Sequence, residues 1–198
     1  MKITNLLSLI IVLAGFNSFA QSGIPSAAIQ IQTAVLAAPA DKRENATVLG
    51  YDEKGAFIEL RKGTNEIICL ADDPKLPGLN IASYHQDLEP FMKRGRDLKR
   101  SGKSAKETTD IRDGEVISGK LLMPKQPTTL YVYTAKAENY EANTGLVKDG
   151  FLRYVIYVPY ATAESTGLPI KPDVAGMPWL MDPGSHRAHI MITPAPKN

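Results

Sequence analysis

Cysteine is nearly absent from this chain, since Cys69 is the only one among its 198 residues. A single cysteine cannot form an internal disulfide, so we expect a fold that is stabilised by packing rather than by cross-links. Cys69 stands in the apolar run 66–70, where a buried core side chain is its simplest role.

Long hydrophobic runs are absent as well. A helix that crosses a bilayer needs about 20 apolar residues, and the apolar run at 6–14 is much shorter. No later run comes closer to that length, so we expect no membrane-spanning segment.

The first residues have the pattern of a secretory signal peptide. Lys2 supplies a positive charge ahead of the apolar run, and Ser18 and Ala20 are the small residues that a signal peptidase reads. We interpret 1–20 as a cleaved signal peptide and expect the mature protein to be exported, either to a periplasm or out of the cell. The single cysteine lies far from the cleavage point, so we expect no lipid anchor and a mature protein that is free in solution.

An excess of charge of either sign is also lacking. The chain has 23 basic and 21 acidic residues, and its formal net charge of +2 falls to +1 when Lys2 is removed with the signal peptide. This balance and the exported location both disfavour nucleic acid as a partner. The remaining residues, 21–198, have the usual length of a single globular domain.

The first part of this domain contains one helical and three β-rich runs. Residues 26–38 are spaced for a short helix, although the alternation within 29–32 would also suit a strand; we favour the helix. The runs 46–51, 56–61 and 66–70 are separated by turns that contain glycine. They predict an antiparallel meander.

The middle of the chain is helical. Residues 86–101 place apolar side chains on one side of a helix that ends before a glycine. Ser104 and Glu107 then have the spacing of a capping box, which opens a second helix that runs toward Gly119.

Strand patterns return in the last third of the chain, at 128–134, 151–158 and 187–193. The run 151–158 is apolar or aromatic on both faces, as in a central strand. The whole pattern predicts an α+β fold: an antiparallel sheet of about six strands with a helical pair inserted mid-chain and packed on one face.

The segment 161–185 has no helical or strand period, yet it contains four prolines, three glycines and the only tryptophan. Long ordered loops of this kind are often functional. A tight turn is expected at 182–185. We expect this loop and the strand that follows it to bind a ligand or partner, with the following candidate residues: Tyr160, Trp179, Asp182, His186 and His189.

Two of the three histidines and a carboxylate lie within 182–189. Imidazole and carboxylate groups bind divalent metals and perform acid–base catalysis. A metal site would use His85, Asp182, His186 and His189. Histidines three apart on a strand point to opposite faces, so the last two converge only if His186 still belongs to the turn. The alternative role of His85 is to cap the helix that follows it.

Three further patterns have a structural and a functional interpretation. Asp72 and Asp73 precede a proline, where carboxylates bind hard cations but more commonly form turns. The second pattern is a basic helical face, which suits an anionic surface or a solvated outer side: Lys93, Arg94, Arg96, Lys99, Arg100, Lys103 and Lys106. The third is an aromatic set, which suits ligand stacking or cross-strand packing: Tyr131, Tyr133, Tyr154, Tyr157, Tyr160 and Trp179.

Two functions therefore compete. The favoured one is an exported, non-catalytic module that binds a small molecule or an envelope component through the loop 161–185. The alternative is a hydrolase-like enzyme, with or without a divalent metal, that uses the His186 and His189 region. Neither the cofactor nor the oligomeric state follows from the sequence.

Overall fold

The computed structural model describes residues 23–195. The predicted signal peptide, 1–20, lies outside these residues, so its cleavage stays a prediction. Within the described part of the chain, no helix is both long and apolar enough to cross a bilayer.

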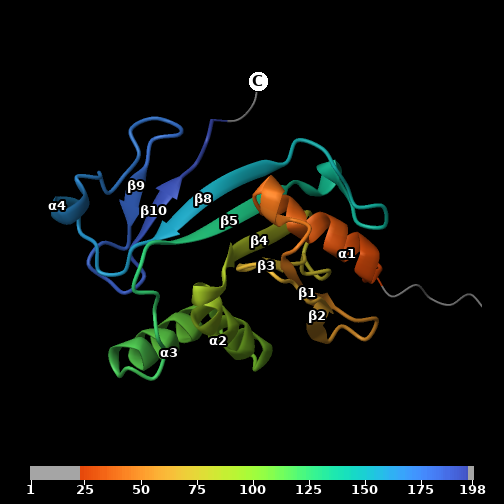
Figure 1. Ribbon diagram of the computed structural model, residues 1–198, viewed down its shortest axis with the longest axis horizontal. Helices are drawn as coiled ribbons and strands as arrows, with labels where there is room; N and C mark the ends of the chain where they lie inside the picture. The colour runs from red at the N-terminus through yellow and green to blue at the C-terminus, as the bar shows by residue number, and fades with distance from the viewer. Residues whose placement is uncertain (1–22, 196–198) are drawn as a thin grey trace, which may run out of the picture.

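The described residues form a mostly antiparallel sheet with helices on both faces (Figure 1). The main strands are β1 (Thr47–Tyr51), β2 (Phe57–Arg61), β3 (Ile67–Leu70), β4 (Leu79–His85), β5 (Thr128–Ala135), β8 (Phe151–Tyr157), β9 (Trp179–Met181) and β10 (His189–Ile192). The helices are α1 (Ala27–Ala34), α2 (Glu89–Arg100), α3 (Ala105–Ile117) and α4 (Ala163–Thr166), and a separate hairpin contains β6 (Tyr140–Glu141) and β7 (Leu146–Val147). The eight main strands have the order β2-β1-β3-β4-β5-β8-β10-β9.

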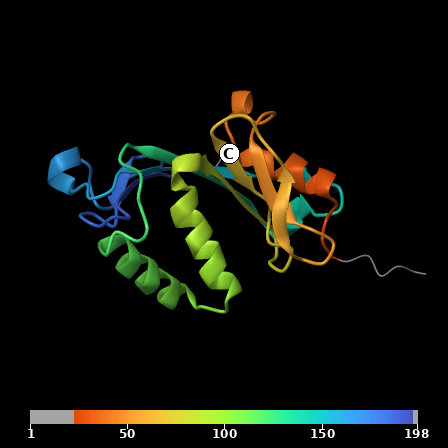
Figure 2. The ribbon, with the colours of Figure 1, turned by 60° about the horizontal axis from the view of Figure 1, so that its bottom comes forward.

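The two faces of the sheet are covered by helices from different parts of the chain (Figures 1 and 2). Ile81 and Ser83 of β4 lie on the face under α1, where the Ser83 hydroxyl donates to the Ala37 carbonyl at 2.9 Å. Tyr84 alternates to the other face and packs against Leu88, just before α2. The predicted α+β fold with an inserted helical pair is confirmed, with eight strands in the sheet instead of about six.

Gln30 attaches α1 to the end of β1. Its side-chain amide donates to the Tyr51 carbonyl and accepts from the Tyr51 N–H, both at 2.8 Å, and it also donates to the Pro25 carbonyl. The side chain is 4% exposed, so all its buried polar atoms need these partners. The helix predicted at 26–38 is confirmed as α1 and the short 3-10 turn Val35–Ala37.

The predicted meander is wrong in its pairing order. β3 runs parallel to β1 on the side away from β2, with Val48 opposite Cys69. The connection between β2 and β3 passes close to the first residue of β1, because the Gly63 N–H donates to the Thr47 hydroxyl at 3.1 Å. The next two backbone N–H groups donate to the Asn45 carbonyl. β3 therefore reaches the far side of β1, and the sheet grows from there.

Sequence reasoning missed β4 and β9. β4 contains Asn80, Ala82 and Ser83, which have low strand propensity. Its last residue is His85, which the sequence pattern assigned to the start of the following helix. β9 has only three residues and follows Pro178. Both strands form because their neighbours in the sheet supply the pairing.

Gly63 provides a test of this topology. A Cβ at this position would lie 2.2 Å from the Thr47 nitrogen and 2.5 Å from two other backbone atoms of the same segment. Gly63→Ala is therefore expected to lower the free energy of unfolding by about 2 kcal/mol or more, measured by urea denaturation.

Gly114 in α3 is the matched control, since a Cβ there would meet open space. Gly114→Ala is expected to raise the free energy of unfolding by about 1 kcal/mol or less, through helix propensity. Equal stability of the Gly63→Ala variant and the unmodified protein would contradict the crossing that the structure shows.

Candidate functional site

The turn predicted at Asp182 forms, and it is attached to the chain that leaves β8. The Ser185 N–H donates to the Asp182 carbonyl at 3.3 Å and closes the turn. Two more backbone bonds join the turn to the segment after β8: the Tyr160 N–H donates to the Ser185 carbonyl at 2.8 Å, and the Gly184 N–H donates to the Ala161 carbonyl at 2.7 Å. Tyr160 and Asp182 therefore belong to one local structure.

His186 and Arg187 connect this turn to α3. The His186 imidazole is 5% exposed, and its Nε2 lies 3.2 Å from Oδ1 of Asp113 on α3. The guanidinium of Arg187 lies 3.6 Å from the same Asp113 oxygen and 3.5 Å from Oδ2 of Asp182. These contacts place α3 beside residues 182–187, which we call the clamp turn.

An aromatic layer lies beside His186, between the helical pair and the sheet. The Phe91 ring from α2 meets the rings of His186 and Tyr157 edge-on, at centroid distances of 6.2 and 6.3 Å. The Tyr157 ring in turn contacts His189 at 5.3 Å, and the Arg112 guanidinium lies over Phe91 at 4.1 Å. The two C-terminal histidines thus pack on neighbouring rings of this layer, His186 on Phe91 and His189 on Tyr157.

The buried His186 favours its neutral form. Burial lowers the pKa of its imidazole below the ordinary value of 6.5, while the negative charge of Asp113 acts against this shift. The positive charges of Arg187 and Arg112 lower the pKa further. The neutral ring thus lies beside the Asp113 carboxylate of α3.

The predicted metal or acid–base site is not assembled. His85 ends β4, and its Nδ1 accepts from the Asp87 N–H at 3.2 Å, which is the capping role that the sequence also allowed. Nδ1 of His189 is bonded to the Arg187 carbonyl at 2.7 Å. Within residues 23–195, no three His, Cys, Asp or Glu side chains are placed to share a metal ion. Two strands, β5 and β8, separate His85 from His189, so the proposed ligands do not meet: His85, Asp182, His186 and His189.

A groove opens beside the clamp turn, between the end of α3 and the segment after β8. Its volume is about 390 Å³, and it is lined by Val116, Gly119, Leu121, Leu122, Met123, Pro124, Lys125, Pro159 and Tyr160. Of the five candidate binding residues, Tyr160 is the one that lines this groove. Trp179 instead pairs with Met191 at the edge of the sheet.

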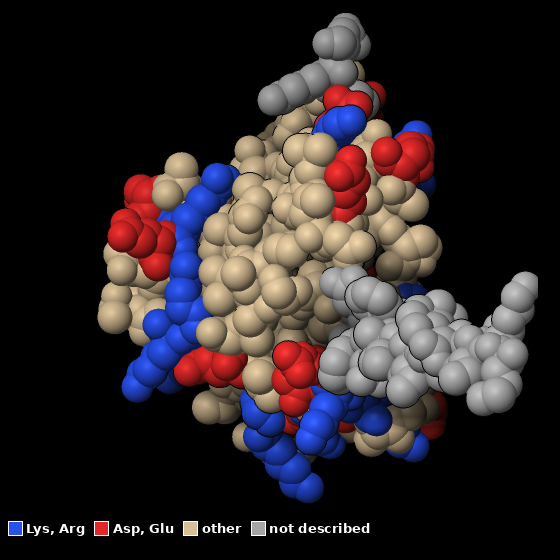
Figure 3. Space-filling view, turned by 90° about the vertical axis from the view of Figure 1, so that its right-hand side faces the viewer, with Lys and Arg blue, Asp and Glu red and all other residues tan. Residues whose placement is uncertain are grey.

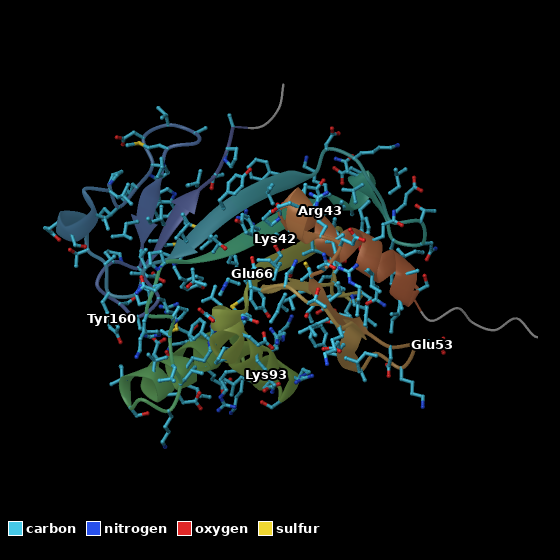
Figure 4. The ribbon with its side chains drawn as sticks, in the orientation of Figure 1. Lys42, Arg43, Glu53, Glu66, Lys93 and Tyr160 are labelled. Atoms are coloured by element: carbon cyan, nitrogen blue, oxygen red, sulfur yellow. The ribbon has the colours of Figure 1, made fainter. Side chains whose placement is uncertain are left out.

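Tyr160 is held in an unusual conformation at the rim of this groove. Its φ is 65°, in the left-handed region that a bulky residue rarely adopts, and the bond from its N–H to Ser185 helps to maintain it. The side chain is 61% exposed. Figure 4 shows it near the loop that follows α3, far from Glu53 at the other end of the molecule. The backbone is thus strained at the position where an aromatic ring is presented to solvent.

The basic face of α2 and the start of α3 is paired with acids. The ion pairs are Lys93–Asp97, Arg94–Glu115, Arg96–Glu89, Lys99–Asp73, Arg100–Asp97, Lys103–Glu107 and Lys106–Asp110. Phe91 and Leu98 on the opposite side are buried. This arrangement supports the interpretation of α2 as a core-packing helix with a solvated outer side rather than as an anionic-surface anchor.

The aromatic set is divided between the two faces of the sheet. Tyr131 and Tyr154 are cross-strand partners with an edge-on contact at 6.0 Å. Tyr157 alternates to the opposite face, where it packs against Phe91. The strands therefore use these rings in cross-strand and helix packing, and the set does not form a single stacking surface.

Comparisons with protein-family models, with curated proteins and with solved structures give no significant match. The function must therefore be argued from the geometry of this chain.

Asp113 provides a test of the contact between α3 and the clamp turn. Asp113→Asn is expected to lower the pKa of His186 further, because it removes the charge that opposes the effect of burial. NMR titration of the three imidazoles measures this shift, with the His186 signal identified by its loss in His186→Gln. An unchanged pKa of His186 in Asp113→Asn would show that the contact is absent.

The same group affects stability with a defined sign. Because the folded pKa of His186 lies below 6.5, the unfolded chain takes up the proton more readily. Its contribution to stability is complete above that ordinary value and is lost as the pH falls toward the folded pKa. As the pH falls through this window, the unfolding free energy of the unmodified protein is therefore expected to decrease relative to that of His186→Gln, which lacks the imidazole.

Proposed function

We propose that this protein is an exported, non-catalytic module that binds an apolar segment of a partner protein in the groove beside Tyr160. The observation that carries this proposal is the exposure of large apolar side chains around an apolar hollow. Leu122 and Tyr160, which line the groove, are 70% and 61% exposed, and the neighbouring Ile117 is 81% exposed. Clustered apolar side chains on a surface commonly mark an interaction site.

The shape and charge of the groove favour a protein segment over a substrate. Small-molecule sites enclose most of their ligand, whereas this hollow is open along one side. Lys125 is the single charged residue among the described residues that line it. The groove thus offers no pair of groups for acid–base chemistry. It suits an apolar segment that carries one carboxylate to face Lys125.

The groove also modifies the site expected from the sequence. The loop 161–185 contributes through the clamp turn, which holds both walls, while the contact surface comes from Tyr160 and the loop after α3. The partner that we propose is an envelope or secreted protein in the same compartment.

Peptide selection tests this function directly. Random peptides displayed on phage and selected on the immobilised protein are expected to yield sequences with two or more large apolar residues and an acidic residue. Leu122→Asp is expected to weaken the binding of a selected peptide by about tenfold or more, because it puts a charge into the apolar contact.

Val174→Asp is the matched control, since Val174 is 66% exposed but does not line the groove. It is expected to leave the affinity unchanged. Lys125→Glu is expected to exchange the acidic preference of the selected peptides for a basic one. Selection of peptides that bind the Leu122→Asp variant equally well would reject the groove as the binding site.

Export has a separate test. When the full chain is produced in bacteria, N-terminal sequencing of the exported protein is expected to begin at Gln21, directly after the predicted cleavage point. Ala20→Arg is expected to block cleavage, because the peptidase accepts a small residue there. Retention of Met1 on unmodified protein that has left the cytoplasm would contradict the assignment.

A further inference from the structure

A second, smaller pocket lies at the opposite end of the sheet, where α1 begins. Its volume is about 230 Å³, and the residues that line it include Gln30, Thr33, Asp72, Leu76, Gly78 and Tyr140. Figure 3 faces this side of the molecule and shows a broad uncharged area with both basic and acidic side chains at its margins. Asp72 is the single charged residue among the described residues that line the pocket.

The Asp72 carboxylate has no counter-charge of its own. Its Oδ1 accepts from the Asn80 N–H at 2.8 Å, but it forms no ion pair with any residue in the described range. The adjacent Asp73 differs, since it pairs with Lys99 at 3.4 Å. Burial raises the pKa of Asp72 to about 6, helped by the negative charge of Asp73 and opposed by the hydrogen bond from Asn80. A carboxylate that the fold itself does not neutralise is thus directed at a cavity.

Two hydroxyl groups complete the polar part of the pocket. Thr33 is 1% exposed, and its hydroxyl donates to main-chain carbonyls within α1, so it forms part of the wall. Tyr140 lies near both: burial and the charge of Asp72 raise the pKa of its phenol, while a hydrogen bond with Thr33 lowers it. The Gln30 amide is occupied by Tyr51 and forms only a wall. Among the described residues that line this cavity, the Asp72 carboxylate and the Tyr140 phenol oxygen are therefore the two side-chain groups that can accept from a ligand.

We propose that this pocket binds a primary alkylammonium group, with Asp72 as its counter-ion, the Tyr140 oxygen as a further acceptor, and the apolar walls around its aliphatic stem. An ammonium group has three donors and no acceptor. The side chains of Pro25, Leu76 and Ala137 supply the apolar walls.

Two other cations fit less well. A hard divalent metal takes six to eight oxygen ligands or several carboxylates, and the described residues contain no group of three acidic or other metal-binding side chains. A guanidinium ion pairs best with both oxygens of a carboxylate, and at Oδ1 of Asp72 it would share the oxygen with the Asn80 N–H, whereas an ammonium group needs a single oxygen. A free small amine and a lysine side chain both present this ammonium group, and the chemistry is the same in both.

NMR titration of the purified protein with n-butylammonium at pH 7.5 tests the proposal. Saturable shifts are expected at the backbone amides of Gly78 and Asn80, which border the pocket. Asp72→Asn is expected to lower the affinity by about tenfold or more, because a charged hydrogen bond is lost. The variant is expected to stay folded, since its amide oxygen still accepts from Asn80 and burial no longer acts against a charge.

Asp73→Asn is the matched control and is expected to retain binding. n-Butanol, the neutral analogue, and guanidinium are expected to bind at least about tenfold more weakly than the amine. A capped Ala-Lys-Ala peptide separates the two sources: tighter binding than n-butylammonium identifies a lysine side chain, and weaker binding identifies a free amine. Equal affinities of the amine and of n-butanol, or of the unmodified protein and Asp72→Asn, would reject the proposal.

The pH dependence adds a second readout. The groups that face Asp72 are Asp73 beside it, Tyr51 of β1 and Tyr140 of β6, with Lys99 of α2 paired to Asp73. Neither tyrosine ionises near neutral pH, since burial raises both phenol pKa values. Amine affinity is therefore expected to be complete above the pKa of Asp72, which is about 6, and to fall as the pH drops through it. An affinity that does not change between pH 7.5 and 5 would contradict the assignment.

Discussion

The clamp turn is the constraint on which the candidate groove depends. One wall of the groove is the end of α3, where Asp113 lies against His186 and Arg187. The other wall is Pro159 and Tyr160, which is fixed by the bond from the Tyr160 N–H to Ser185. A single turn of six residues thus positions two segments that are far apart in the sequence. His186, which resembles a metal ligand in the sequence, lies between these two segments and contacts α3.

The sequence predicted the elements better than the pairing between them. The capping box of Ser104 and Glu107 is local, and both of its hydrogen bonds form. The parallel pairing of β1 with β3 depends on how closely Gly63 can approach Thr47, which no local pattern encodes. A three-residue strand such as β9 has too few residues to show a period.

In the candidate site, too, the local features were predicted and the contacts between distant segments were not. Tyr160 and the turn at Asp182 were predicted, because proline, glycine and aromatic residues mark an ordered loop. Asp113 was missed, since its only signal is its position on the inward side of α3. Leu122 was also missed, because an apolar residue in a loop is ordinary until a neighbour such as Tyr160 is seen beside it. Sites of this kind arise between distant segments, so they become visible only when the fold is known.

The lone thiol has a use that follows from its position. Cys69 is fully buried between α1 and β1, and burial raises the pKa of its thiol to about 12. It is therefore protonated and inaccessible in the folded protein, so that oxidants and other chains do not reach it. Alkylating reagents gain access only when the helix lifts from the sheet. The rate at which this sulfur is labelled thus reports how often that half of the molecule opens, without any engineered probe.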